Sequence, residues 1–149
     1  MTSHSPAPAP AARSPIRTVI EAGVSYFALV FSAGFVLGLV RQLWLQPAIG
    51  ARAAELAEMP IMLIVLFFSA RFVVQRYGLM TRRGLRVGVG LLALLILLLA
   101  EVGLVLLLQN QSLGAYLASR DPVSGAVYLG MLLLFAAMPR VVLRKPSSR

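Results

Sequence analysis

The sequence predicts an all-α polytopic membrane protein, in which four transmembrane helices form a compact bundle with both termini in the cytoplasm. Of the 149 residues, 59% are hydrophobic and only 13% are charged, whereas soluble domains carry about 25% charged residues. The apolar residues form long blocks, and a block such as Thr18–Val40 matches the roughly 20 residues that a helix needs to cross the bilayer. The Lys and Arg residues are also divided unequally between the connections. A chain of this length has too little interior to bury such blocks, so lipid must cover them.

The predicted transmembrane domain, residues 18–143, lies between two polar tails. The N-terminal tail, residues 1–17, is rich in Pro, Ala and Ser and is expected to be disordered. The spanning helices are expected at about 18–40, 60–77, 87–108 and 123–143. Residues 41–59 form an external connection that should carry a short amphipathic helix ahead of Pro60, and residues 144–149 form a basic C-terminal tail. Pro60 itself fits an early turn of the second spanning helix.

The direction of insertion follows from the distribution of positive charge. Ten of the fourteen Lys and Arg residues fall in the two tails and the connection after the second helix, and three fall in the other connections. Arg71, inside the second apolar block, is the remaining one. Cytoplasmic loops carry the excess of positive charge, so this split places both termini in the cytoplasm. The net charge of +9 therefore serves topology and contact with lipid headgroups, and nucleic acid is not an expected partner.

Glu101 is the acid that most needs an explanation, because it lies inside the third apolar block. It is about 10 Å from the external end of that helix, which is too far for a glutamate to reach water along the helix. It must be protonated, or face protein or trapped water. Two arginines could pair with it: Arg41 at the outer end of the first helix, and Arg71 in the second. Arg71 could instead extend to the cytoplasmic surface.

Gly34 and Gly38 form a small-x-x-x-small motif in the first helix, on the same stripe as Arg41. Such a motif lets helix backbones approach closely, and the third helix, with Gly90 on the face of Glu101, is the expected partner. This packing would place Glu101 beneath Arg41.

Glu55 and Glu58 form an acidic pair in the external connection and would share one helix face. Two carboxylates at this spacing could hold a hard cation. They could equally be balanced by Arg41, Arg52 or Arg120, and this interpretation is favoured, so no metal site is predicted.

The residue types that are missing narrow the function. The chain has no cysteine, which excludes disulfides, thiolate catalysis and iron–sulfur ligation, and its single histidine, His4, lies in the tail. No catalytic motif is present, so neither an enzymatic activity nor a cofactor is expected. The first hypothesis is a non-enzymatic membrane subunit or scaffold in which buried Glu/Arg ties fix helix packing. The alternative is a small proton-coupled transporter or channel, oligomeric, with Glu101 as the titrating group. The expected partners are the lipid bilayer and either further copies or a larger membrane complex.

Several stretches resemble a family of small bacterial inner-membrane proteins with four helices. They are "YFALVFSAGFVLGLVR", "MPIMLIVLFFSARFVV", "LLLAEVGL" and "DPVSGAVYL", and the resemblance extends over about residues 26–139. The resemblance implies a multi-pass protein of the bacterial inner membrane. No activity is established for that family, so the resemblance implies no function.

Overall fold

The computed structural model describes residues 14–108 and 122–142, and within these ranges all regular structure is helical. The elements are α1 (Pro15–Val40), the π-helix η1 (Arg41–Leu45), α2 (Gln46–Ile49), α3 (Ala51–Arg76), α4 (Arg83–Leu108) and α6 (Pro122–Val141). The predicted all-α class is confirmed for this part of the chain. Residues 1–13 of the predicted N-terminal tail, residue 143 at the end of the predicted fourth helix, the predicted C-terminal tail 144–149, and Arg120 lie outside the described ranges.

The first helix is longer than the sequence pattern predicts. It begins at a favourable N-terminus, where the Ser14 side chain accepts a hydrogen bond from the Arg17 N–H and Pro15 occupies the first turn. It then continues without a break through η1 and α2 to Ile49, giving a rod of 35 residues, about 52 Å long. Gly50 ends it with φ at 83°, a left-handed conformation that glycine adopts at little cost.

The predicted external connection 41–59 is therefore wrong as a separate segment. Residues 41–49 extend the first helix, and α3 begins directly after Gly50, at Ala51 and not at Pro60. The helix-forming stretch that was expected to lie on the membrane surface is thus the first part of α3. Pro60, expected in an early helical turn, lies inside that helix.

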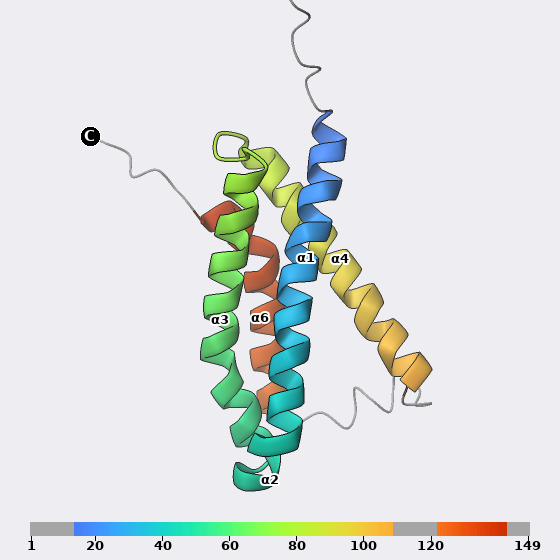
Figure 1. The fold of residues 1–149 in the computed structure, drawn as a ribbon, viewed down its shortest axis with the longest axis vertical. Helices are drawn as coiled ribbons and strands as arrows, with labels where there is room; N and C mark the ends of the chain where they lie inside the picture. The colour runs from blue at the N-terminus through green and yellow to red at the C-terminus, as the bar shows by residue number, and fades with distance from the viewer. Residues whose placement is uncertain (1–13, 109–121, 143–149) are drawn as a thin grey trace, which may run out of the picture.

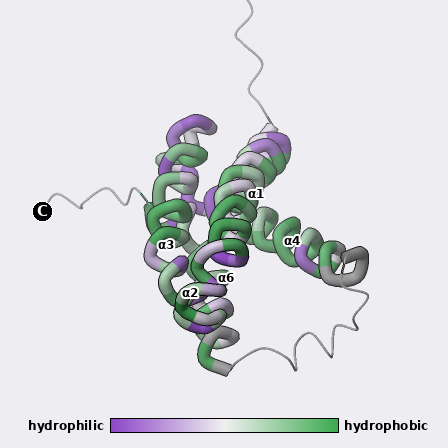
Figure 2. Tube along the Cα trace, turned by 60° about the horizontal axis from the view of Figure 1, so that its bottom comes forward, coloured by the Kyte–Doolittle hydropathy of each residue, from purple (hydrophilic) through white to green (hydrophobic). Residues whose placement is uncertain are grey.

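The successive long helices α1, α3, α4 and α6 run in alternating directions along the bundle (Figure 1). The start of α1, the turn between α3 and α4, and the end of α6 lie at one end, which we call the termini end. Helix α2, which Gly50 follows directly, lies at the other end with the last residues of α4 and the start of α6, and we call this the Gly50 end. Helix α4 contacts α1 and α6, but towards the Gly50 end it leans away from the other helices in Figures 1 and 2.

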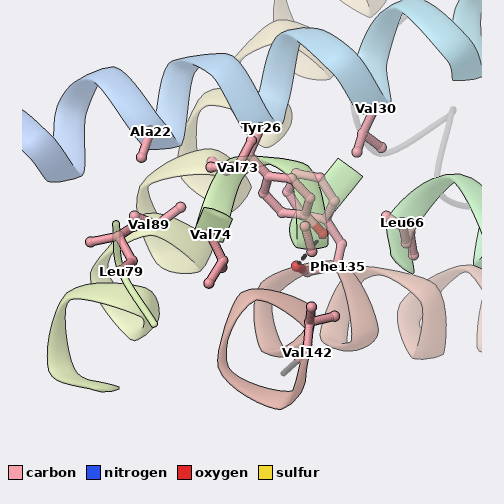
Figure 3. Packing of buried hydrophobic residues seen from close by; sticks show 12 residues of the cluster. Ala22, Tyr26, Val30, Leu66, Val73, Val74, Leu79, Val89, Phe135 and Val142 are labelled. Atoms are coloured by element: carbon pink, nitrogen blue, oxygen red, sulfur yellow. Dashed lines mark hydrogen bonds between the residues drawn. The ribbon is translucent and has the colours of Figure 1, made fainter. Parts of the chain in front are cut away.

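The core lies in the half of the bundle nearer the termini end. Tyr26 of α1 and Phe135 of α6 stack with ring centroids 4.7 Å apart and planes at 11° (Figure 3). Both are buried, together with small and β-branched residues from α3 and α4 such as Ala70, Val73 and Val89. The four helices are therefore joined by one continuous apolar cluster.

A proline explains why a tyrosine stands in this core. Pro139 lies inside α6, and it lacks the N–H that would donate to the carbonyl four residues earlier, that of Phe135. The Tyr26 hydroxyl donates a hydrogen bond to this carbonyl, 3.0 Å away. In an apolar setting a backbone carbonyl without a partner is costly, so Tyr26 supplies the donor that Pro139 removes.

Arg86, at the start of α4, is the buried charged residue of the described ranges, with 3% of its surface exposed. Its Nε donates to the Leu79 carbonyl at 2.7 Å, Nη1 donates to the Val142 carbonyl at 3.0 Å, and Nη2 donates to the Met80 carbonyl. The guanidinium thus joins the turn after α3 to the end of α6. The sequence analysis treated Arg86 only as a charge that sets topology.

Helix length and composition support membrane association. Three helical segments in the described ranges are long and apolar enough to cross a membrane: Pro15–Ile49, Ala51–Arg76 and Arg83–Leu104. Gly125–Val141 of α6 is a shorter apolar helix. Large apolar side chains cover the outside of the bundle, and most of the helical tube is coloured hydrophobic in Figure 2. The described bundle therefore has three such helices and a fourth, shorter one.

A candidate polar cavity between four helices

A cavity of about 340 Å³ lies in the half of the bundle nearer the Gly50 end, and α1, η1, α3, α4 and α6 all contribute to its wall. Most of the wall is apolar and includes Phe31, Met62 and Met131. Its charged residues are three acids and one arginine: Glu55, Glu58, Glu101 and Arg41. The cavity therefore gathers five of the seven residues that the sequence analysis singled out, the fifth being Gly34.

Arg41 contacts both acids of the external pair. Its Nη1 lies 3.2 Å from Glu55 Oε1, and its Nε lies 3.1 Å from Glu58 Oε2. The Nε atom is fully covered but is not aligned for a hydrogen bond. Arg41 is thus the residue that balances Glu55 and Glu58. These contacts tie the extension of the first helix to the first part of α3.

The π turn helps to position this arginine. Arg41 is the first residue of η1, and its carbonyl accepts from the Gln46 N–H, five residues later. Pro47 follows at once and cannot donate to the Leu43 carbonyl, a setting in which the wider π turn replaces the α-helical ladder. The π turn changes the direction in which side chains leave the helix at the point where Arg41 contacts α3.

Glu101 has a different partner from the predicted one. The Tyr128 hydroxyl of α6 donates a hydrogen bond to Glu101 Oε2, so the acid ties α4 to α6. Neither Arg41 nor Arg71 forms an ion pair with it in the described structure. Arg41 forms ion pairs with Glu55 and Glu58, and Arg71 is exposed on α3. The expected Glu101–arginine pair is therefore corrected to a glutamate–tyrosine pair.

The glycine motif of the first helix does not pack against the predicted helix. A Cβ at Gly34 would meet Met62 of α3, 3.5 Å away, and a Cβ at Gly38 would have no described atom within 4 Å. Helix α4 packs on α1 nearer the termini end, where a Cβ at Gly23 would lie 2.9 Å from the Leu92 side chain. The expected groove does not receive α4, because α4 leans away at that level.

Gly90, expected to face the first helix, makes its close contact with α6. A Cβ at Gly90 would overlap the backbone carbonyl of Ala136. Gly90 therefore allows a close approach of α4 to the backbone of α6.

The described residues include no group of three or more His, Asp or Glu side chains that could hold a metal ion. Glu55 and Glu58 face Arg41, which occupies the place that a cation would take. The polar groups of the cavity are thus carboxylates, a guanidinium and a phenol.

Comparisons with protein-family models, with curated proteins and with solved structures found no match to this chain. The function must accordingly be argued from the geometry of the chain itself.

Three residues with clear structural roles escaped the sequence analysis: Tyr26, Arg86 and Tyr128. The sequence contains a pattern that would have indicated the roles of Tyr128 and Tyr26. Glu101 is seven residues before the end of α4 and Tyr128 is six residues after the start of α6, so both lie about 10 Å from the Gly50 end. Pro139 likewise indicates a carbonyl in need of a donor. Arg86 left no comparable signal, because its acceptors are backbone carbonyls of other segments.

Proposed function

We propose that this chain is a multi-pass protein of the bacterial inner membrane with both termini in the cytoplasm. Six of the nine arginines in the described ranges lie at the termini end, which supports this orientation under the positive-inside rule. The shorter apolar helix α6 provides the fourth crossing.

The orientation can be tested with single cysteines, since the natural chain has none. Ile49 at the Gly50 end and Met80 in the turn after α3 are both exposed. We expect Ile49→Cys to react with a membrane-impermeant maleimide in intact spheroplasts, and Met80→Cys to react only after lysis. The reverse pattern would contradict the orientation.

We propose further that the chain acts without enzymatic chemistry, as a membrane subunit or scaffold. The scaffold proposal rests on one observation: the polar side chains between the helices form ion pairs and hydrogen bonds that join one helix to another, and we call these contacts ties. Arg41 joins the first helix to α3 through Glu55 and Glu58, and Glu101 joins α4 to α6 through Tyr128. Polar contacts of this kind hold transmembrane helices together where lipid offers no partner.

The test removes the charge of Arg41 in the full-length protein. Arg41→Gln leaves two acids without their cation, and we expect a loss of about 1–2 kcal/mol. This is less than the 3–5 kcal/mol of a fully buried pair, because Arg41 and Glu55 are about one-third exposed. Arg71→Gln, at an exposed position outside these ties, is the control. Combining Arg41→Gln with Glu55→Gln and Glu58→Gln should restore stability, measured by unfolding in mixed micelles. Equal stability of Arg41→Gln and Arg71→Gln would contradict the scaffold role.

A second function, proton-coupled transport with Glu101 as the titrating group, is favoured by one observation. Glu101 lines the cavity, and its described hydrogen-bond partner is the phenol of Tyr128 and not an arginine. Proteoliposome flux driven by a pH gradient distinguishes the two functions. The transporter requires flux that Glu101→Gln abolishes, whereas the scaffold predicts equal signals from both proteins.

A further inference from the structure

The cavity is large enough to hold a small molecule. Its volume of about 340 Å³ falls at the lower end of the range of ligand sites in proteins. It lies between the two polar ties, with Arg41 and its acids on one side and Glu101 on the wall formed by α4. Towards the Gly50 end, α4 leans away from the other helices (Figure 1).

The charges on the wall favour a positively charged occupant. The lining contains three carboxylates and one guanidinium. Arg41 is paired with two of the carboxylates through Nη1 and Nε, and these two acids would repel an anion that approached it. Glu101 forms no ion pair with an arginine of the described residues, and its described hydrogen-bond partner is the hydroxyl of Tyr128. A cation could therefore be received by Glu101 without disturbing the Arg41 tie.

The rest of the wall favours an apolar body attached to that cation. Phe31 offers an aromatic ring, which also attracts a cation over its face. Met59, Met62 and Met131 bring flexible and polarizable side chains that adapt to irregular shapes. An inorganic cation would gain little from such a lining, whereas an organic cation would bury its apolar surface there.

We propose that this cavity binds small organic cations with an apolar body, the positive group lying against Glu101 and the body between Phe31, Met62 and Met131. The proposal goes beyond the scaffold function and requires no transport.

The test is equilibrium dialysis of radiolabelled phenyltrimethylammonium against the purified full-length protein in mild detergent micelles. Its neutral isostere tert-butylbenzene, which has the same shape without the charge, serves as the competitor that isolates the ionic contribution. We expect saturable binding of the cation that the isostere competes away at least about tenfold less well than unlabelled cation. This factor corresponds to one charge–charge contact of about 1.4 kcal/mol.

Two variants and a control locate the site. Glu101→Gln should weaken binding at least about tenfold. Glu21→Gln, which removes an acid that pairs with Arg17 on α1 away from the cavity, should leave binding unchanged. Met131→Trp keeps every charge but fills the cavity, and it should abolish saturable binding. Size-exclusion profiles that match the wild type establish that each variant is folded.

Absence of saturable cation binding by the folded wild type would overturn the proposal. So would unchanged affinity in both Glu101→Gln and Met131→Trp, or equal competition by the neutral isostere, because the cavity would then be an apolar space filled by lipid chains. None of these results tests the ion pairs of Arg41. The scaffold function is tested separately, by the stability of Arg41→Gln.

Discussion

The hydrogen bond from Tyr26 to the Phe135 carbonyl can be removed without disturbing its surroundings. Tyr26→Phe keeps the ring that stacks on Phe135 at 4.7 Å and deletes only the hydroxyl. Hydrogen bonds between transmembrane helices contribute about 0.6 kcal/mol on average and up to about 1.7 kcal/mol. We expect a loss near the upper value, because Pro139 leaves the carbonyl without its usual helical donor. The free energy of unfolding in mixed micelles measures it.

A double-mutant cycle with Pro139→Ala tests the reason for this bond. Alanine restores the N–H that can donate to the Phe135 carbonyl, so the hydroxyl of Tyr26 becomes dispensable. We expect Tyr26→Phe to cost at least about 0.5 kcal/mol less in the Pro139→Ala background than in the wild type, which is the size of coupling expected for residues in contact. Equal costs in the two backgrounds would refute the reasoning, because the carbonyl would then not depend on what Pro139 removes.

Two further predictions concern the close packing near the termini end. Gly90→Ala should lower the free energy of unfolding by about 1–3 kcal/mol through overlap with the Ala136 carbonyl. Gly103→Ala in the same helix meets no described atom within 4 Å and should be neutral or stabilising by up to about 1 kcal/mol. Arg86→Met should destabilise by at least about 2 kcal/mol, because three carbonyls lose a charged donor. The exposed Arg83→Met, its control, should stay within about 0.5 kcal/mol, and equal effects would contradict the role of Arg86.

Hydropathy predicts the helical class and the approximate positions of the spanning segments, because apolar blocks of sufficient length have few alternatives to a helix in lipid. It does not predict the long extensions on either side of Gly50. Residues such as Arg41, Glu55 and Glu58 interrupt the apolar pattern and were interpreted as a surface connection. In the structure Arg41 forms ion pairs with both acids, and the helices continue past these residues. Charge pairing between neighbouring helices is a property of the fold and is not visible in a window of hydropathy.

The partner of Glu101 was mispredicted for a different physical reason. An ionised acid in lipid suggests an arginine, but a phenol at the same depth satisfies the carboxyl group as well. Tyr128 stands at that depth on the antiparallel neighbour, and its hydroxyl donates to Glu101. Comparing the distances of the residues from the helix ends identifies Tyr128 as a partner. Looking only for a positive charge to pair with Glu101 indicates Arg41 and Arg71 instead. Depth is therefore the better guide to pairing inside a bundle, provided that the neighbouring helices are known.

The two ends of the bundle are built differently, and the cavity lies nearer one of them. At the termini end, Tyr26, Arg86 and Gly90 join the helices through backbone carbonyls in a closely packed core. At the Gly50 end, side-chain ties and a cavity take the place of close packing, and α4 leans outward. A bundle held at one end can change shape at the other without losing its core. Substitutions near the core should consequently change the free energy of unfolding alone, whereas substitutions of the side chains that line the cavity should change both stability and what the cavity holds.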